Sequence, residues 1–522
     1  MPINLDYISR CCSRKFYCLI LSTFFSLLLV IHTACNKTSA TSEINVIIEK
    51  RVPTFDPRAS ADSASERFRQ LVFNSLMRKG DNFEPVPELA ESLQIAPDYR
   101  TFIFKLKHNV KFHDGRAFTS LDVKYTFETM LKDKSLVKGA SFEQDLASIE
   151  TPDADTVIFH CHHAFPSLPN DIIPVGIIPE GTANQQAKQP IGTGPFKFAS
   201  YVEDQQIKLK AFEDYFNGRP SFSQLNIKII PDNTTRENEL RKGTADLAIN
   251  ADLDPVAVES LQKLRDVKVE IVDGTNLAHL GVNLLDPILK DQRVRQAIAY
   301  AIDRETIIQE IFRGQAKLAA TILPVTQWAY ETGVQKYNYD PQRSMQLLDE
   351  AGYKSNNGQP RLKLGLKTST LSISRKVGEA IQSQLSKVGI SLELQSLERQ
   401  KLTQDMTDGN FQLYYNVMVG GNQSTDMFRF VYHSRSIPPS GVQNRSRYTN
   451  PQVDRLLDEA LMASRERQQQ IFSEVQKILA VELPQIYLWY QSGVVVYRDR
   501  LENIKPDPSG DWRIISQIKI VK

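Results

Sequence analysis

Residues 101–131, TFIFKLKHNVKFHDGRAFTSLDVKYTFETML, limit the fold most because a strand pattern and a helix pattern follow each other directly. In the part 101–112, phenylalanine and leucine alternate with polar residues, which predicts a strand that ends near the end of this part. Asp114 and Gly115 then form a typical turn pair. Thr119 is placed to cap a following helix. The stretch therefore predicts a mixed α/β chain.

The same stretch contains His113 beside Asp114, which raises the alternative of a catalytic site. Neighbouring side chains of an extended segment point to opposite faces, so this pair is not a dyad. Nothing else nearby supplies the convergent geometry that catalysis requires. We therefore interpret the stretch as a structural corner of strand, turn and helix.

The pattern of strands and helices continues along the chain. Segments 360–368 and 390–397 alternate like strands. Segment 375–389 has one apolar helical face and ends in Gly389, a favourable residue after a helix. Three more helices are predicted from apolar spacing and caps, beginning near Asp340-Pro341, at Asn450-Pro451 and before Ile471. Long linkers and internal repeats are not evident, which favours several α/β lobes.

The N-terminus has the layout of an export signal. Basic residues precede the uncharged apolar run Phe16–Ile31, and small residues follow it up to Cys35. A permanent N-terminal anchor helix is the alternative, although the run is short for a membrane span. The ending TAC resembles a lipobox with His32 in place of the usual leucine, so we expect acylation of Cys35. Cys161 would then have no partner, and we expect no disulfide.

Composition and motifs exclude several classes of function. Hydrophobic residues make up 41% and charged residues 24%, as in globular proteins, and the net charge of +2 gives no reason to expect nucleic acid. The sequence GTG at 192–194 lacks the third glycine of a dinucleotide motif, and no phosphate-binding loop or zinc-protease motif occurs. We expect no enzymatic activity and no cofactor.

The order of motifs resembles the family 5 extracellular solute-binding proteins, which are the peptide and nickel receptors of ABC importers. The stretch LAESLQIAPDYRTFIFKLKHNVKFHDGRAFTSLDV is similar to their signature, with Leu93, Tyr99 and Asn109 at positions of usual tryptophan and glycine. PIGTGPFKF, KGTADLAI, DQRVRQAIAYAIDRE and YTNPQVDRLLDEA follow in family order. The resemblance covers nearly the whole chain after the signal.

This resemblance implies a two-lobed periplasmic-binding-protein fold of type II, similar to cluster C, with an inserted domain in the first lobe. The expected parts are a signal peptide at 1–34, lobe I from 35–78, 190–275 and 492–522, the inserted domain at 79–189 and lobe II at 276–491. The resemblance also implies closure of the two lobes over a ligand.

It further implies a cleft carboxylate that pairs with the α-amine of a peptide. Asp426 is the only acid in the corresponding segment, YYNVMVGGNQSTDMFRF, and is our candidate, with a helix N-cap as the alternative role. Weaker candidates for the ligand pocket follow from the same segment and from the expected crossing between lobes: Tyr415, Asn416, Phe428, Arg429, Asn276 and Asn283.

The predicted function is that of an exported receptor which captures short peptides and delivers them to an ABC permease and its ATPase. We expect a monomer, held on the membrane by a lipid on Cys35. The alternative is a receptor for a metal complex or another small solute, or an exported metal-handling protein. That alternative would use His160, Cys161, His162 and His163. We favour an edge strand there, because three histidines on a short extended segment cannot converge on one ion.

Overall fold

The computed structural model describes residues 42–521, with gaps at 60–61, 134–135, 137–141, 356–358, 421–423, 440 and 442. The expected signal segment and Cys35 lie outside the described residues. Among the residues that are described, no helix has the length and apolar character needed to cross a membrane.

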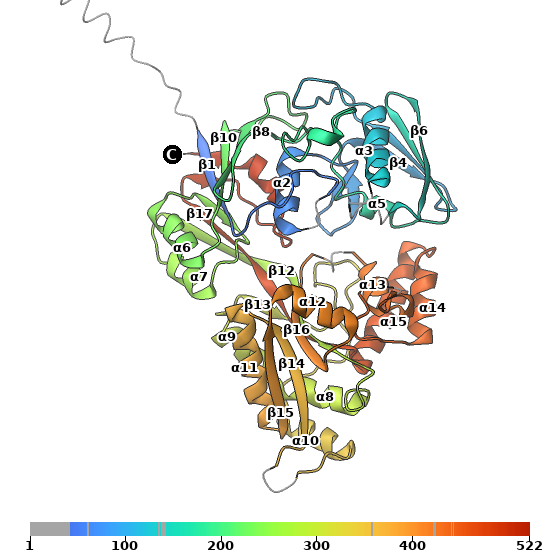
Figure 1. The fold of residues 1–522 in the computed structure, drawn as a ribbon, viewed down its shortest axis with the longest axis vertical. Helices are drawn as coiled ribbons and strands as arrows, with labels where there is room; N and C mark the ends of the chain where they lie inside the picture. Colours follow the sequence, from blue (N-terminus) through green and yellow to red (C-terminus); the bar gives the residue numbers. More distant parts are fainter. Residues whose placement is uncertain are drawn as a thin grey trace, which may run out of the picture. The chain divides into compact units, whose positions relative to one another are not determined.

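The largest sheet in the described part of the chain has eleven strands (Figure 1). Ten of these strands follow the order β15-β14-β16-β12-β17-β11-β1-β10-β9-β8. The eleventh strand, β13, lies outside this order and pairs with β17. The strands are β1 (Glu43–Ile48), β8 (Phe196–Val202), β9 (Gln206–Ala211), β10 (Gln224–Ile229), β11 (Leu247–Ile249), β12 (Val267–Val282), β13 (Ala316–Leu318), β14 (Leu362–Ser369), β15 (Ile390–Leu397), β16 (Leu413–Met418) and β17 (Gln485–Arg498).

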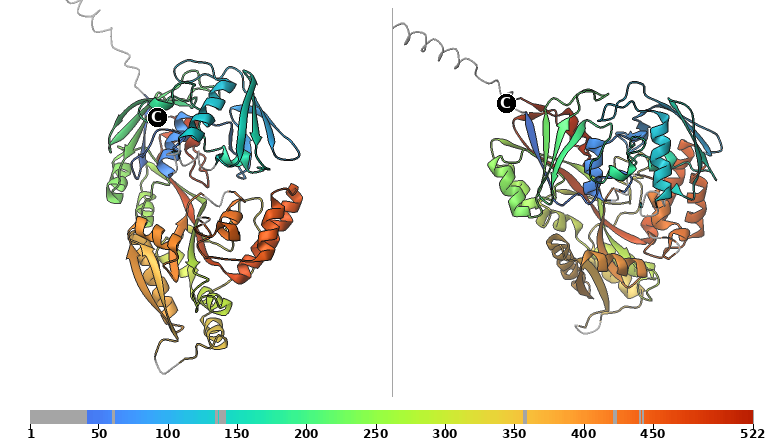
Figure 2. Two further views of the ribbon diagram at one scale, coloured as in Figure 1. Left: turned by 45° about the vertical axis from the view of Figure 1, so that its right-hand side comes forward. Right: turned by 45° about the horizontal axis from the view of Figure 1, so that its top comes forward.

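Two long strands, β12 and β17, connect the two halves of this sheet. They are antiparallel, with pairs running from Val267–Arg498 to Gly281–Gln485. The last part of β17 pairs with β11. The last part of β12 pairs with β16, and the first part of β17 pairs with β13. Figure 2 shows the red strand β17 continuing from the neighbourhood of blue β1 toward the orange strands. The pairing is irregular between Val272 and Asn276, where the two halves meet.

The buried side chains form separate cores. One core draws on residues 44–73, 178–249 and 495–518, and a second draws on 76–177. Two further cores draw on 277–490. We use the names lobe I, inserted domain and lobe II for these three groups.

Lobe I has its helices on the sheet around β1. They are α2 (Ser63–Val72), α6 (Asn233–Lys242), α7 (Pro255–Leu261) and the short helix η4 (Trp512–Gln517), next to the strand pair β18 (Leu501–Glu502) and β19 (Lys519–Ile520). Gly192 and Gly194 lie against the end of α2, and Gly194 N–H donates to the Val72 carbonyl at 2.9 Å. An added Cβ at either glycine would overlap α2 backbone atoms, so the GTG sequence serves close packing.

The inserted domain has its own antiparallel sheet, in the order β4-β5-β7-β6, with α3 packed against β6 and β7 (Figure 1). Its elements are β2 (Met77–Lys79), β3 (Pro85–Pro87), β4 (Ala90–Ile95), β5 (Thr101–Leu106), β6 (Leu146–Asp153), β7 (Thr156–Cys161), α3 (Ser120–Lys132) and α5 (Leu168–Asp171). The short helix η1 (Ala183–Gln185) follows in lobe I, where Ala183 packs against the core.

The stretch around His113 is the predicted structural corner. Thr119 and Asp122 form a capping box at the start of α3. Strand β5 ends at Leu106, earlier than the alternation suggested, and a single bridge joins Lys111 to Ala117. His113 Nε2 lies 2.9 Å from the Gly194 carbonyl, and burial lowers the pKa of this histidine to about 4. The ring thus joins the inserted domain to lobe I and does not pair with Asp114.

Lobe II contains the remaining helices, and the four helices predicted from spacing and caps are all present. They are α8 (Gln292–Ala301), α9 (Arg304–Glu310), α10 (Pro341–Glu350), α11 (Ser372–Ser386), α12 (Arg399–Asp408), α13 (Met427–Tyr432), α14 (Pro451–Ala460), α15 (Arg465–Glu482) and the short helix η3 (Ser434–Ser436). Asp340 and Asn450 cap α10 and α14 as expected.

Candidate functional site

A pocket of about 170 Å³ lies where β12 and β17 pass between the two halves of the sheet. We call it the β12–β17 pocket. Lobe I contributes a wall around Asn250 and Pro255, and lobe II contributes Phe312 and Ile373. Pockets between lobes are common ligand sites because closure can bury the ligand from both sides.

Four carboxamide side chains line this pocket, and two of them hold its walls. The Asn250 Oδ1 atom accepts from Val494 N–H at 2.7 Å, and Gln315 Nε2 donates to the Pro255 carbonyl at 3.2 Å. The other two, Asn276 and Gln491, are register partners on β12 and β17 and are half-buried. Within the described part of the chain, neither side chain has a hydrogen-bond partner. Each can therefore donate to and accept from a ligand amide.

Exposed apolar side chains gather near the carboxyl ends of β14 and β16, which run parallel. Leu371 follows β14 and is 59% exposed, and Val419 follows β16 and is 62% exposed. Val419 also comes one residue after Met418, whose partner on β12 is Leu277, next to Asn276. In open α/β sheets, ligands bind outside the carboxyl ends of the strands. This edge therefore offers an apolar wall beside the β12–β17 pocket.

Asp426 precedes α13 and is half-buried. Its carboxylate accepts a hydrogen bond from the Ser424 hydroxyl at 2.7 Å and makes no bond to the first turn of the helix. Asp426 thus occupies the N-cap position of α13, as the alternative predicted, but its side chain does not cap the helix. Burial raises the pKa of Asp426, while Ser424 and Arg429 oppose the shift. A cation at this carboxylate would favour its ionised form.

A second carboxylate, Asp171 at the end of α5, was not singled out from the sequence. Its side chain accepts from the Ser167 hydroxyl at 2.8 Å. Burial, followed by the nearby charge of Asp426, raises the pKa of Asp171 to about 7. The charge of Asp426 in lobe II thus acts on the Asp171 carboxylate of the inserted domain. No sequence signal could show this, because the two residues come from different parts of the fold.

We expect Asp171→Asn to remove a pH-dependent destabilisation of the folded protein. The pKa of Asp171 lies near the ordinary aspartate value of 3.8 in the unfolded chain and near 7 in the folded protein, so the folded state holds the proton more tightly. Between these two values the free energy of unfolding decreases as pH rises, and the full cost is present above the folded pKa. The variant should be about 1–2 kcal/mol more stable than the wild type at pH 8, after discounting for partial exposure. It should gain nothing near pH 4.

Urea denaturation at several pH values between 4 and 8 measures this effect. Asp81→Asn changes an exposed carboxylate of the same part of the chain and serves as the control. An unchanged pH dependence in Asp171→Asn would contradict the raised pKa of Asp171.

Several of the weaker candidates have structural roles that make them unsuitable as ligand contacts. Tyr415 is 2% exposed in a lobe II core beside Trp489, and Phe428 is 0% exposed and stacks on Phe472. The Asn283 amide donates to the Gly409 and Phe411 carbonyls at 3.2 and 2.9 Å. These three assignments to the ligand pocket are wrong. Tyr415 and Phe428 came from the segment that resembles the family's ligand segment, and Asn283 came from the expected crossing between lobes. Neither source tells which side chains pack inside the fold.

The other candidates differ in position. Arg429 is 3.5 Å from Asp458, so an acid on α14 already partners this guanidinium. Asn276 lines the β12–β17 pocket as described above. Asn416 is half-buried on β16 opposite His279 and stays a prediction. Gln491 was missed in the sequence, because only the register of β17 against β12 places its side chain opposite Asn276.

The histidine cluster is divided among different partners. Nε2 of His160 lies 3.3 Å from Glu150, and Nε2 of His163 lies 2.7 Å from Asp145. Cys161 is a buried, free thiol in the core of the inserted domain, and burial raises its pKa to about 11. Over the described residues, no group of three or more His, Cys, Asp or Glu side chains is arranged to hold a metal ion.

Comparison with known proteins gives the family. Residues 84–437 match the family of bacterial extracellular solute-binding proteins, family 5. The chain belongs to this family. A Brucella ovis protein named as a putative ABC transporter peptide-binding protein is 32% identical over 480 residues, which are 87% of this chain and 88% of the relative. The heme-binding protein A of Haemophilus influenzae is 28% identical and matches 84% of this chain and 85% of its own length.

A solved structure supports the same assignment. The oligopeptide-binding protein AppA of Bacillus subtilis, in complex with a nonapeptide, superposes with a TM-score of 0.75 at 25% identity, covering 92% of this chain and 99% of AppA. The two-lobed, type II binding-protein fold expected from the sequence is confirmed. Family 5 consists of bacterial extracellular solute-binding proteins.

Proposed function

We propose that this protein captures short peptides outside the cytoplasmic membrane and delivers them to an ABC permease driven by a separate ATPase. The observation that carries the proposal is the pair of half-buried carboxamides, Asn276 and Gln491, without partners in the described part of the chain. A peptide main chain repeats the N–H and C=O groups that two such amides can bond. The names of AppA and the Brucella relative agree with a peptide ligand.

In this proposal Asp426 binds the α-amine of the peptide. An ammonium group between lobe II and the inserted domain would also relieve the repulsion between Asp426 and Asp171. The apolar wall at Leu371 and Val419 would contact uncharged peptide side chains. Ligand binding would shift the protein toward its closed form because only that form contacts the ligand from both sides.

The proposal also includes the cellular location. Cys35 follows an apolar signal and would carry the acyl chains that hold the mature protein on the membrane. A single chain would be the working unit, docking on the permease in its closed form.

Native mass spectrometry of protein purified without denaturation tests the ligand class. The chain would begin at Asn36, so that no lipid is present, and bound molecules would be released and sequenced. A set of short peptides supports the proposal. A porphyrin, a metal complex or one non-peptide mass would instead identify a different solute for the same family of receptor.

A further inference from the structure

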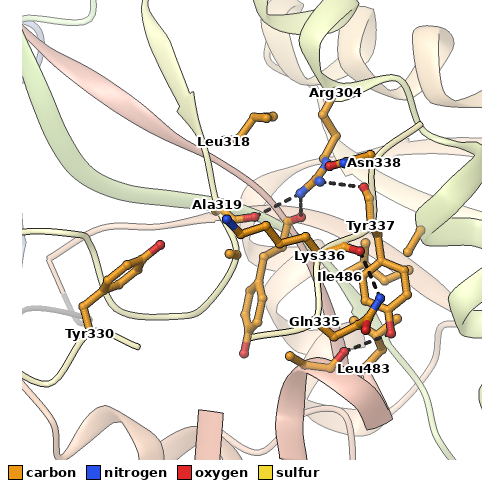
Figure 3. Close-up of a pocket in the computed structure, with 14 residues that line it drawn as sticks. Arg304, Leu318, Ala319, Tyr330, Gln335, Lys336, Tyr337, Asn338, Leu483 and Ile486 are labelled. Atoms are coloured by element: carbon orange, nitrogen blue, oxygen red, sulfur yellow. Dashed lines mark hydrogen bonds between the residues drawn. The ribbon is translucent and has the colours of Figure 1, made fainter. Parts of the chain in front are cut away.

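A second cavity lies within lobe II and shares no lining residue with the β12–β17 pocket. Its volume is about 160 Å³, and Figure 3 shows the side chains around it. We call it the Arg304 cavity. Strand β17 passes both cavities, since Tyr487 lines this one and Gln491 lines the other. Four residues of strand separate the two positions by about 13 Å.

The cavity has a positive charge that no lining carboxylate compensates. Nη1 of Arg304 donates to the carbonyls of Ala319 and Tyr487 at 3.0 and 3.1 Å, and Nη2 donates to the carbonyl of Tyr337 at 2.7 Å. Carbonyl groups orient the guanidinium but leave its net charge in place. In the part of the chain that the structure describes, neither Arg304 nor Lys336 forms an ion pair, and no aspartate or glutamate lines the cavity.

Two acids flank Arg304 at the start of α9, and neither lines the cavity. Asp303 uses its carboxylate to accept hydrogen bonds from the N–H and hydroxyl of Thr306, at 3.0 and 2.7 Å. Glu305 is exposed and lines an adjacent surface pocket, and its charge opposes the effect of burial on the pKa of Arg304. Burial lowers the pKa of Arg304, but an arginine remains charged at any physiological pH.

The rest of the lining is apolar with a few hydrogen-bond donors. Figure 3 shows the Lys336 side chain extending along the cavity toward Ala319, and the Tyr330 hydroxyl directed into the same space. Among the described residues, neither the Lys336 ammonium nor the Tyr330 hydroxyl has a hydrogen-bond partner. Apolar side chains complete the wall: Leu318, Ala319, Leu483 and Ile486. An anionic head and an apolar body fit this combination.

We propose that the Arg304 cavity is a second small-molecule site, which binds an organic carboxylate with a compact apolar body. A cavity of this volume accommodates a molecule about the size of benzene. The carboxylate would pair with Lys336 Nζ and accept from the Tyr330 hydroxyl, in the field of the oriented Arg304 guanidinium. The apolar body would lie against Leu318 and Ile486. This inference does not depend on the peptide ligand proposed for the β12–β17 pocket.

Titration of 4-fluorobenzoate into the full chain, followed by ¹⁹F NMR, tests the proposal. We expect saturable binding that Lys336→Met weakens at least about fivefold, while Lys336→Arg retains it. Arg304 is left unchanged because its three carbonyl contacts support the fold. Lys363→Met changes an exposed lysine of β14 outside the cavity and should have no effect.

Two further comparisons distinguish the nature and place of binding. Benzyl alcohol, the uncharged counterpart, should bind at least about fivefold more weakly than benzoate. Asp426→Asn should leave benzoate affinity unchanged, since Asp426 does not line the Arg304 cavity. The proposal is overturned by no binding up to about 10 mM, by equal affinity in Lys336→Met, by inorganic phosphate displacing benzoate at equal concentration, or by tighter binding in Asp426→Asn.

Discussion

Asp426→Asn should weaken binding of peptides with a free α-amine by roughly 10- to 100-fold. Asparagine keeps the shape of the side chain but loses the negative charge that faces the ammonium. A hydrogen bond to a charged group contributes about 1.5–3 kcal/mol, and each 1.4 kcal/mol is about tenfold in affinity. Calorimetric titration with a peptide identified by native mass spectrometry measures the change.

The matching change in the ligand is acetylation of the α-amine of the same peptide. Wild-type protein should prefer the free amine over the acetylated form, and Asp426→Asn should lose this preference. Asp408→Asn, an exposed carboxylate of α12, is the matched control and should bind like the wild type. If Asp426→Asn still discriminates between the two peptides, Asp426 is not the ammonium partner.

Gly274→Ala should lower the free energy of unfolding by about 3 kcal/mol and impair ligand binding as well. A Cβ atom at this position would lie 2.0 Å from the backbone oxygen of Gln491 and 2.9 Å from Gly493 N. Both are backbone atoms, so no side-chain rotation can relieve the overlap. The strands must separate at the irregularity between Val272 and Asn276, which would move Asn276 away from Gln491.

Gly365→Ala is the control for Gly274→Ala. Gly365 lies on β14 in the same sheet, and its added Cβ would meet only Gln412 Oε1 at an ordinary contact distance of 3.6 Å. Chemical denaturation and peptide affinity of the two variants can be compared directly. Equal stability of both variants would show that β12 and β17 can move apart at Gly274 without loss of stability.

Local signals predicted much of the secondary structure. Thr119 caps α3 with Asp122, and Asp340-Pro341 starts α10, because these signals act over a few residues of backbone. The apolar spacing of 375–389 correctly located α11 for the same reason. The interpretation of His113 as part of a structural corner is also confirmed, since turn and cap chemistry explained its neighbourhood.

The candidate site was harder to predict because its residues meet only through long-range pairing. Asp426 was found through family resemblance, whereas its electrostatic partner Asp171 lies in another part of the fold. Tyr415 and Phe428 were assigned from the resemblance of their segment to the family, and this resemblance did not show that the core buries both side chains. Once the core is packed, such aromatic side chains are no longer available to a ligand.

The sequence by itself thus determined the α/β class, the caps and turns, and the order of motifs that marks the family. Only the tertiary structure decided which polar groups are free to bind. Asn276 and Gln491 become neighbours when β12 pairs with β17, and Asn283 becomes a structural residue when its amide meets Gly409 and Phe411. The physical reason is that buried polar groups form hydrogen bonds between segments far apart in the chain. Only the tertiary structure shows which polar groups remain without such a partner and can bind a ligand.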